Sequence, residues 1–507
     1  MRLELGYFKA LGVFGIIKPF TFNLFVFLSL LGNIASISAV NKNGEGKVPK
    51  FTFTSGVLSY DVAYNLALSE MQSNIDQKNG TFIAGSGWTQ LWTRDTSFAI
   101  ELSAGLLHPE TSKASLELCT EIDRNIGTVW LQDECGHFGG WPNLSDAIVG
   151  ASGSWSLFLV TGDESFLSWA YKITKNSLAR AERDVYNSET GLFMGCSSFM
   201  ESNSGYPSQY AMNGTLVGQT KALSTNMLYY RGYKIAADMG AVLGASEAEI
   251  RKMIEKSENI RKAVEARLWM PNEGHFSYFE DKDGALVEQN EALGESLLLL
   301  APKFESENSR ADIIFHNTHR SGVGIPCLWP KFDLHETSDI ASYYHNGRIW
   351  PFVQGFWAIA AARHKRVDIF GEEFANLVKL SQIDKSHETF AEFYELDGEY
   401  QKIRSRQLWS DSGFLGMVFH GLFGINLGVD GIWISPSKPE WLPFSNTVSL
   451  LRIIYRDMEL DIHVNGHGSE IDSFRLDGKL QGLNFVSNTL KGSHQVEIEL
   501  FSNAVQG

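Results

Sequence analysis

A short stretch in the C-terminal third of the chain concentrates carboxylates among aromatic side chains. HETFAEFYELDGEYQKIRSRQLWSDSGF, residues 387–414, holds Glu392, Glu395, Asp397 and Glu399. Partial desolvation beside aromatic rings moves carboxylate pKa values toward neutrality, so such groups can act as general acids or bases. The chain has 59 acidic residues, and most of them must be solvated surface. A function for this stretch therefore requires a second carboxylate elsewhere, with polar and aromatic side chains around both.

A second candidate loop, GWTQLWTRDTSFAIELSAGL, carries Trp88, Trp92, Arg94 and Asp95 directly before a helical pattern. An Arg–Asp pair can bind sugar hydroxyls, while the indole faces stack on the apolar side of a sugar ring. The same letters also suit an ordinary helix start with a salt bridge. Both interpretations stay open for this loop taken alone.

Glu201 lies in a Gly- and Ser-rich loop, GLFMGCSSFMESNSGYPSQY, between Phe199 and Tyr206. A lone carboxylate in such a loop is usually a surface residue. Its role depends on whether the fold brings it close to the stretch around Glu392.

The loop YYHNGRIWPFVQGFW carries His345, Asn346, Arg348 and Trp350 before another helical pattern. Pro351 suits the first turn of that helix, where its missing N–H costs nothing. Helix capping does not need histidine, arginine and tryptophan together. This cluster therefore favours a binding site.

Helical spacing of apolar residues runs from VLSYDVAYNLALSEMQSN to about residue 428. After that first helix, the predicted helices cover residues 96–107, 110–126, 145–162, 165–185, 218–240, 246–268, 289–302, 306–315, 350–365, 370–383 and 409–424. Loops rich in Gly, Trp, Asn and Tyr separate them, including CGHFGGWPN with Trp141. Because loops on a rigid scaffold commonly carry binding residues, we expect the site in these loops.

The period changes at about Val429, where short apolar or alternating pieces are divided by Gly, Pro and Asn turns. This pattern predicts antiparallel strands. At the other end, basic residues precede TFNLFVFLSLLGNIASISAV, the order of a secretory signal, with a membrane anchor as the alternative. We therefore predict a signal peptide over residues 1–39, a helical domain over 40–428 and a small β-sandwich over 429–507.

Composition excludes some classes of partner. The net charge of −16 disfavours nucleic acid and anionic lipid, which need basic surface. The chain has 13 Trp and 33 Phe, which fits both a large core and a sugar-binding cleft. Four cysteines without a CxxC pair suggest no zinc ribbon, although an oxidising compartment would allow one bridge, for instance Cys119 to Cys135.

Taken in order, the motifs WTRD, YHNGRIWP, ExYxxDGE and QLWSDSG, followed by a β tail, resemble those of the six-hairpin (α/α)6 glycosidases. The resemblance is greatest to the bacterial family 63-like group and to glycogen-debranching-type glucosidases, and it covers residues 50–507. It implies a mainly α fold, an (α/α)6 toroid with a small C-terminal antiparallel β-sandwich. It also implies hydrolysis of glycosides with inversion.

Position by position, the resemblance implies that Glu392, in FAEFYELDGE, is the general base. It places the general acid in the SSFMESNSGYP loop, where relatives carry an Asp and this chain has Glu201. The longer Glu side chain must reach the same glycosidic oxygen from a shifted backbone, so Asp146 and Asp95 are alternative acids.

Inversion needs an acid that protonates the leaving oxygen and a base that deprotonates a water on the opposite face of the sugar ring. The two carboxyl groups of such a pair are about 6.5–9.5 Å apart. Burial among aromatics would keep the acid protonated, so we expect Glu201 to have the higher pKa. The candidate substrate-binding residues are Trp88, Trp92, Arg94, Asp95, Trp141, Asp146, Tyr206, His345, Asn346, Arg348, Trp350 and Trp409.

The sequence thus predicts a periplasmic or secreted, exo-acting hydrolase of an α-linked, glucoside-like sugar. Two other functions fit the same fold, a disaccharide phosphorylase and a carbohydrate-binding protein that has lost catalysis. We expect an oligosaccharide or glycoside partner, no nucleic acid and no membrane apart from the signal segment. No cofactor is expected. FEDKDGALVEQ matches a calcium loop only in part and is more typical of a β-turn, so a structural Ca²⁺ stays an alternative for this segment.

Overall fold

The computed structural model describes residues 51–134, 139–200, 203–210, 213–302, 308–333 and 344–501. Residues 49–507 form one compact unit. The predicted signal segment over residues 1–39 lies outside the described residues, and so does Glu201. In the part of the chain that the structure describes, no helix combines the length and apolar character that a membrane crossing needs.

Six of the described helices form a closed ring. Each contacts the next in chain order, and the last contacts the first. They are α3 (Thr93–Ala99), α6 (Val149–Thr161), α9 (Leu223–Val242), α11 (Ala292–Leu299), α13 (Pro351–Arg363) and α15 (Leu408–Gly416). Wider π-helical turns extend two of them, η1 (Ile100–Ala104) after α3 and η6 (Met417–Leu422) after α15.

Each ring helix is preceded in the chain by an outer helix. The outer helices are α2 (Leu58–Ser73), α5 (Pro109–Leu118), α7 (Glu164–Asp184), α10 (Glu247–Arg267), α12 (Asn308–Asn317) and α14 (Val367–Ser381). This alternation of outer and inner helices is the six-hairpin arrangement that the sequence predicted. The fold is therefore mainly α, as expected, with an appended β region.

Burial explains which helices lie inside. All residues of α13 from Pro351 to Ala362 are buried, whereas α10 buries only a narrow stripe and is otherwise charged. A helix that is apolar on all sides must be enclosed, and an amphipathic one can cover it. Glycine permits the tightest contact, since a Cβ on Gly355 of α13 would lie 2.7 Å from the Cα of Gly413 in α15.

Short β-hairpins lead from several outer helices into inner ones. They are β2–β3 (Ile75–Asp76, Thr81–Phe82), β4–β5 (Thr120–Asp123, Gly127–Trp130), β6–β7 (Tyr186–Asn187, Leu192–Phe193) and β9–β10 (Trp269–Met270, His275–Phe276). The predicted helix over residues 110–126 was wrong in its second half. It ends at Leu118, because the next residues pair as β4 with β5 around a turn at Asp123 that ends in Gly127 at φ 105°.

The loop before α15 is held by α2, the first of the outer helices. Glu70 of α2 accepts hydrogen bonds from the Thr389 hydroxyl at 2.6 Å and from the Phe390 N–H at 2.9 Å. These two residues are separated from Glu70 by more than 300 positions, so the contact joins the last helical pair to the first. It also fixes the backbone just before Glu392.

The β region consists of two sheets. The six-stranded sheet has the order β1-β16-β17-β21-β18-β19 and the three-stranded sheet the order β14-β15-β20. Their strands are β1 (Thr52–Thr54), β14 (Ile425–Leu427), β15 (Gly431–Ile434), β16 (Thr447–Tyr455), β17 (Met458–Asn465), β18 (Ile471–Leu476), β19 (Lys479–Leu480), β20 (Phe485–Ser487) and β21 (Gly492–Leu500).

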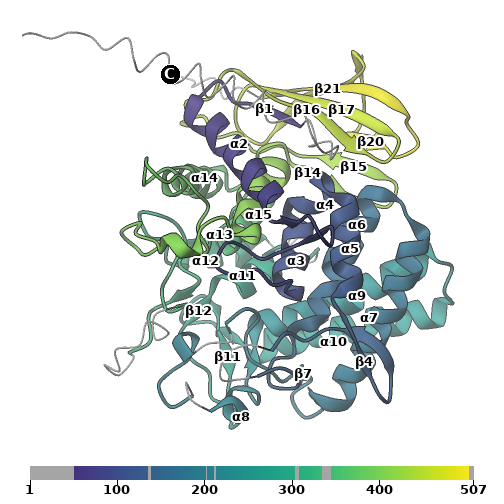
Figure 1. The fold of residues 1–507 in the computed structure, drawn as a ribbon, viewed down its shortest axis with the longest axis vertical. Helices are drawn as coiled ribbons and strands as arrows, with labels where there is room; N and C mark the ends of the chain where they lie inside the picture. The colour runs from purple at the N-terminus through teal and green to yellow at the C-terminus, as the bar shows by residue number, and fades with distance from the viewer. Residues whose placement is uncertain are drawn as a thin grey trace, which may run out of the picture. The chain divides into compact units, whose positions relative to one another are not determined.

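The prediction of a wholly antiparallel β region was wrong at one pair, because β17 and β21 run parallel over eight residues from Met458↔Gly492 to Asn465↔Glu499. The reason is that β18, β19 and β20 lie between them in the chain and provide a long return connection. The strands lie at one end of the helical ring in Figure 1. The Arg456 N–H donates to the Val160 carbonyl near the C-terminal end of α6, so this region covers the C-terminal ends of inner helices.

Candidate active site

The predicted base lies at the opposite end of the ring, where inner helices begin. Glu392 is in the loop before α15, and its side chain is 2 % exposed. The loop backbone is fixed by Tyr394, which exchanges two hydrogen bonds with Ile349 just before α13. The Glu392 carboxylate is thus presented by a loop that is held on both sides by the scaffold.

Among the described residues, three side chains donate to Glu392. The Trp88 indole Nε1 donates to Oε1 at 2.8 Å, the Tyr344 hydroxyl donates to the same oxygen, and the Arg404 Nη1 donates to Oε2 at 2.6 Å. Burial raises the pKa of Glu392, and Arg404 with the hydrogen bonds from Tyr344 and Trp88 opposes that rise. Such an environment makes a carboxylate more basic than a solvated one while a cation favours its charged form.

Trp88 and Trp92 form an aromatic wall beside Glu392, and Arg94 lies next to it. Trp92 meets Trp88 edge to face at 6.4 Å between ring centroids, and Arg94 lies 5.9 Å from the Trp92 ring. Arg94 is buried between Asp133 at 4.0 Å and Asp146 at 3.8 Å. The Arg94 side chain is therefore part of a buried charge cluster directly behind the aromatic wall.

The acidic members of this cluster have defined partners. Asp146 accepts from Gln132 Nε2 at 3.0 Å and from the Ser198 hydroxyl at 2.9 Å. Burial raises the pKa of Asp133 to about 6, against the effect of Arg94. Asp95 accepts from Gln407 Nε2 at 3.2 Å, just before α15. Asp146 and Asp95, the alternative acids, thus both have hydrogen-bond donors inside the protein.

Both flanks of Glu201 reach the Glu392 region. Before it, the Phe199 backbone has a left-handed φ of 61°. The centroid of the Phe199 ring lies 5.3 Å from that of Trp350 and 5.2 Å from that of His345. After it, the Ser204 hydroxyl accepts from the His345 N–H at 2.7 Å. Tyr344 adjoins His345 and contacts Trp350 at 5.1 Å between ring centroids. The segment on either side of Glu201 is therefore packed on the loop that carries a donor to Glu392.

The remaining residues of the YHNG loop divide by role. His345 stacks on Trp350 at 4.9 Å, and burial lowers its pKa well below the usual range, so its imidazole is neutral. Asn346 exchanges two hydrogen bonds of 2.9 Å with the Phe332 backbone and holds the loop. Arg348 pairs with Glu395, which gives that carboxylate a structural partner.

Three other predicted site residues have different surroundings. Trp409 stacks on Phe352 at 4.1 Å, inside the aromatic cluster that also contains Trp350. Tyr206 is fully buried, and its hydroxyl accepts from the Ser197 N–H at 2.7 Å. Trp141 donates to Asp184 at 3.0 Å and lies over Arg180, so its contacts are with α7 and not with the residues around Glu392.

Sequence reasoning missed Tyr344 and Arg404, the two donors that flank Glu392. Tyr344 stood in the quoted YYHNG motif, so its position next to His345 was a usable signal. Arg404 is one of two arginines in KIRSRQ, and only the fold distinguishes it from Arg406.

The three described cysteines, Cys119, Cys196 and Cys327, are all buried. The Cys119 thiol lies close to Thr93 and Thr96 of α3. Cys135, its possible disulfide partner, lies outside the described residues, so a bridge between the two stays a prediction.

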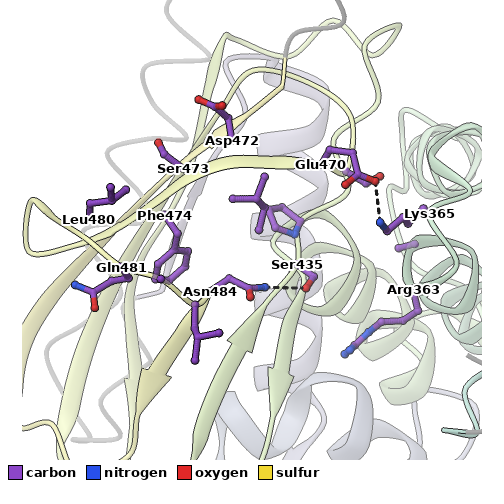
Figure 2. Close-up of a pocket in the computed structure, with 16 residues that line it drawn as sticks. Arg363, Lys365, Ser435, Glu470, Asp472, Ser473, Phe474, Leu480, Gln481 and Asn484 are labelled. Atoms are coloured by element: carbon purple, nitrogen blue, oxygen red, sulfur yellow. Dashed lines mark hydrogen bonds and ion pairs between the residues drawn. The ribbon is translucent and has the colours of Figure 1, made fainter. Parts of the chain in front are cut away.

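A cleft of about 770 Å³ lies elsewhere, between the end of α13 and the β18–β19 region (Figure 2). Its polar groups largely satisfy one another, since Lys365 pairs with Glu470 at 2.8 Å and Asn484 donates to Ser435 at 3.2 Å. None of its lining residues belongs to the Glu392 cluster. We therefore place the candidate active site at Glu392.

A ring of six helical hairpins with a buried carboxylate among tryptophans, a tyrosine and an arginine defines the class of the protein, an (α/α)6-type glycoside hydrolase. The family model of the mannosylglycerate hydrolase MGH1-like glycoside hydrolase domain matches residues 144–410, a little over half of the chain. The chain belongs to this family. The matched region includes Glu201, His345 and Glu392.

Solved structures share the fold. A sialidase superposes with a TM-score of 0.65 at 16% identity, and a family 78 rhamnosidase of Bacillus sp. GL1 with 0.57 at 11%; each match covers 90% of this chain. The chain spans only 44% of the length of both proteins. The family 63 mannosylglycerate hydrolase of Thermus thermophilus, in complex with Tris, has a TM-score of 0.53 at 14% identity, covering 70% of this chain and 100% of that one. A comparison with curated protein sequences found no significant match.

Proposed function

We propose that the protein is an exo-acting glycoside hydrolase that cleaves an α-linked, glucoside-like sugar with inversion, using Glu392 as general base and Glu201 as general acid. The observation that carries the proposal is the setting of Glu392, buried at the N-terminal end of the ring and held by Trp88, Tyr344 and Arg404.

The two acids divide the work. The carboxylate of Glu392 takes a proton from a water molecule, whose oxygen attacks the anomeric carbon. The Glu201 carboxyl gives its proton to the glycosidic oxygen as the bond to that carbon breaks. The packing of Phe199 and Ser204 on His345 supports this assignment, because it brings both flanks of Glu201 to the loop beside Glu392.

The aromatic wall supports a sugar as the substrate. Trp88 and Trp92 are half-buried side chains beside the base, with polar N–H groups and apolar faces. Sugar rings present C–H faces that pack on indoles and hydroxyls that bind charged groups. The family match favours mannosylglycerate as a second candidate substrate, since the Thermus thermophilus relative is a mannosylglycerate hydrolase.

A panel of substrates tests the proposal. The purified chain is incubated with 4-nitrophenyl α-D-glucoside, α-D-mannoside and α-L-rhamnoside, with α-disaccharides and with mannosylglycerate. NMR follows the anomeric configuration of the first product. We expect release of a terminal sugar as the β-anomer from an α-D-linked substrate. Products that first accumulate as the α-anomer would contradict inversion.

The same panel separates the rival functions. Turnover that requires inorganic phosphate and yields a sugar phosphate would identify a phosphorylase, which shares the barrel. Binding of a glycoside without any turnover would identify a carbohydrate-binding protein.

Substitution tests the base. Glu392→Gln is expected to lower kcat about 10²- to 10⁴-fold, the usual contribution of a general base. Glu399→Gln, on an exposed residue of the same acidic stretch, is the matched control and is expected to keep wild-type turnover. Full activity of Glu392→Gln would show that the base is another residue.

Localisation in the periplasm or outside the cell belongs to this proposal as well. It is supported by the order of basic, apolar and small residues in the first 39 positions.

A further inference from the structure

Arg404 is joined to Glu392 by backbone and side chain at once. It ends the short helix η5 (Lys402–Arg404), and its carbonyl accepts from the Glu392 N–H at 2.8 Å. Its Nη1 donates to Glu392 Oε2 at 2.6 Å and to the Tyr344 hydroxyl at 3.2 Å. Its Nε donates to Gln401 Oε1 at 3.1 Å. The guanidinium plane is therefore fixed in two directions by hydrogen bonds.

Aromatic rings surround the same guanidinium. Its central carbon lies 4.7 Å from the Tyr344 ring centroid, 5.2 Å from that of Trp88 and 5.7 Å from that of Phe393. Stacking of this kind suits the flat arginine group and not the compact ammonium of lysine. Because the side chain of Arg404 is only 22 % exposed, its charge acts on Glu392 with little screening by solvent.

The two oxygens of the Glu392 carboxylate accept different numbers of hydrogen bonds. A carboxylate offers about four acceptor positions, two on each oxygen. Trp88 and Tyr344 use both positions on Oε1, and Arg404 uses one on Oε2. Among the described residues, no further donor contacts this carboxylate, so the remaining acceptor position is on Oε2, beside Arg404.

We propose that Arg404 is a positioning residue that holds Glu392 charged and directs the reacting water to Oε2. This inference rests on the proposed function. The water then gives one proton to Oε2 while its oxygen bonds to the anomeric carbon. The bond from that carbon to the leaving oxygen breaks, and its electron pair stays on the leaving oxygen, which takes the proton of the general acid.

Other charged groups near the loop are already occupied. His345 is neutral because of burial, Arg348 pairs with Glu395, and Arg94 lies between two aspartates. Arg404 is thus the cation that is paired with Glu392, and its removal should change the titration of that group.

Two substitutions separate charge from geometry. Arg404→Met removes both, so kcat on the fastest substrate of the glycoside panel should fall about 100-fold. The acid limb of the kcat/KM profile, which reports the base in the free enzyme, should move up by about one pH unit or more. Arg404→Lys keeps a charge but loses the stacking and the fork of hydrogen bonds. Its acid limb should stay near that of wild type while kcat falls.

Lys402→Met is the matched control, because Lys402 is in the same short helix but pairs with Asp384 at 2.8 Å on the surface. We expect wild-type kcat and pH profile from this variant. An Arg404→Met enzyme with unchanged kcat and an unmoved acid limb would overturn the inference, as would an acid limb that moves equally in the Lys and Met variants.

A stability cycle tests the contact without any substrate. Urea midpoints are measured for wild type, Arg404→Met, Glu392→Gln and the double variant. We expect Arg404→Met to lower the midpoint and the double variant to recover part of that loss, since it no longer buries an unpaired carboxylate. Additive effects would refute the pairing. If wild type hydrolyses nothing in the panel, the proposed function fails, whereas the cycle still reports on Arg404 and Glu392.

Discussion

Glu295 offers a direct test of how this protein holds buried acids. It lies in the inner helix α11 and is fully buried. Its Oε1 accepts from the Phe276 N–H at 2.7 Å and from Asn290 Nδ2 at 3.2 Å, while its Oε2 receives no hydrogen bond from the described residues. Burial raises the pKa of Glu295 to about 8, and the nearby Glu291 adds to the rise. The folded protein therefore keeps this carboxyl protonated at neutral pH.

The sign of the pH effect follows from linkage. Between pH 4.5 and about 8 the folded state holds a proton on Glu295 that the unfolded state has released. The free energy of unfolding must then fall as the pH rises, by about 1.4 kcal/mol for each pH unit. Between pH 5 and pH 8 this single group accounts for about 4 kcal/mol.

Glu295→Gln removes this dependence, because the amide keeps an acceptor for the Phe276 N–H and cannot ionise. We expect the free energy of unfolding of the variant to fall less between pH 5 and pH 8 than that of wild type, by about 4 kcal/mol. Urea unfolding at the two pH values, followed by circular dichroism, measures the difference. Glu273→Gln, on an exposed residue nearby, is the control. Equal pH dependence in wild type and Glu295→Gln would mean that the buried carboxyl ionises in the folded protein, which would refute the reasoning.

Two further substitutions probe the support of Glu392. Trp88→Phe removes the indole donor to Oε1 but keeps the aromatic face, so kcat should fall about tenfold with little change in the urea midpoint. A clear fall of the urea midpoint in this variant would indicate a structural role instead. Glu70→Ala leaves the Thr389 hydroxyl and the Phe390 N–H without their acceptor and should cost about 3 kcal/mol in urea unfolding, while Glu70→Gln should recover most of that loss. Wild-type stability of Glu70→Ala would show that the first helix does not hold the loop before α15.

Residue type and motif order grouped some residues that the structure brings together and one that lies elsewhere. Trp88 and Glu392 came from their residue types and from the order of motifs, and the structure joins them by a hydrogen bond of 2.8 Å. Trp141 was grouped with them because its loop looked similar, yet it contacts α7. Residue type alone cannot tell an aromatic wall from a surface tryptophan, because the difference lies in which loops the ring of helices brings to one end.

The sequence by itself determined the class of this fold. Helical spacing of apolar residues repeats along about 370 residues and changes to a strand period near Val429. These local patterns follow the packing of each element. Those patterns are local, since each amphipathic or fully apolar stretch records how much of its own surface is covered. They placed most helices within a few residues and named the acidic stretch that contains Glu392.

Only the tertiary structure decided which neighbours Glu392 has. Trp88 is 304 positions from Glu392 and reaches it through ring closure, Tyr344 comes from the loop before α13, and Arg404 lies 12 positions away in the same loop. The same closure gave Glu395 an arginine partner. The long connection through β18, β19 and β20 made β17 and β21 parallel. Contacts between separate loops leave no periodic trace in the sequence, because each depends on how the whole ring packs. The setting of Glu392 is therefore a property of the closed ring of helices.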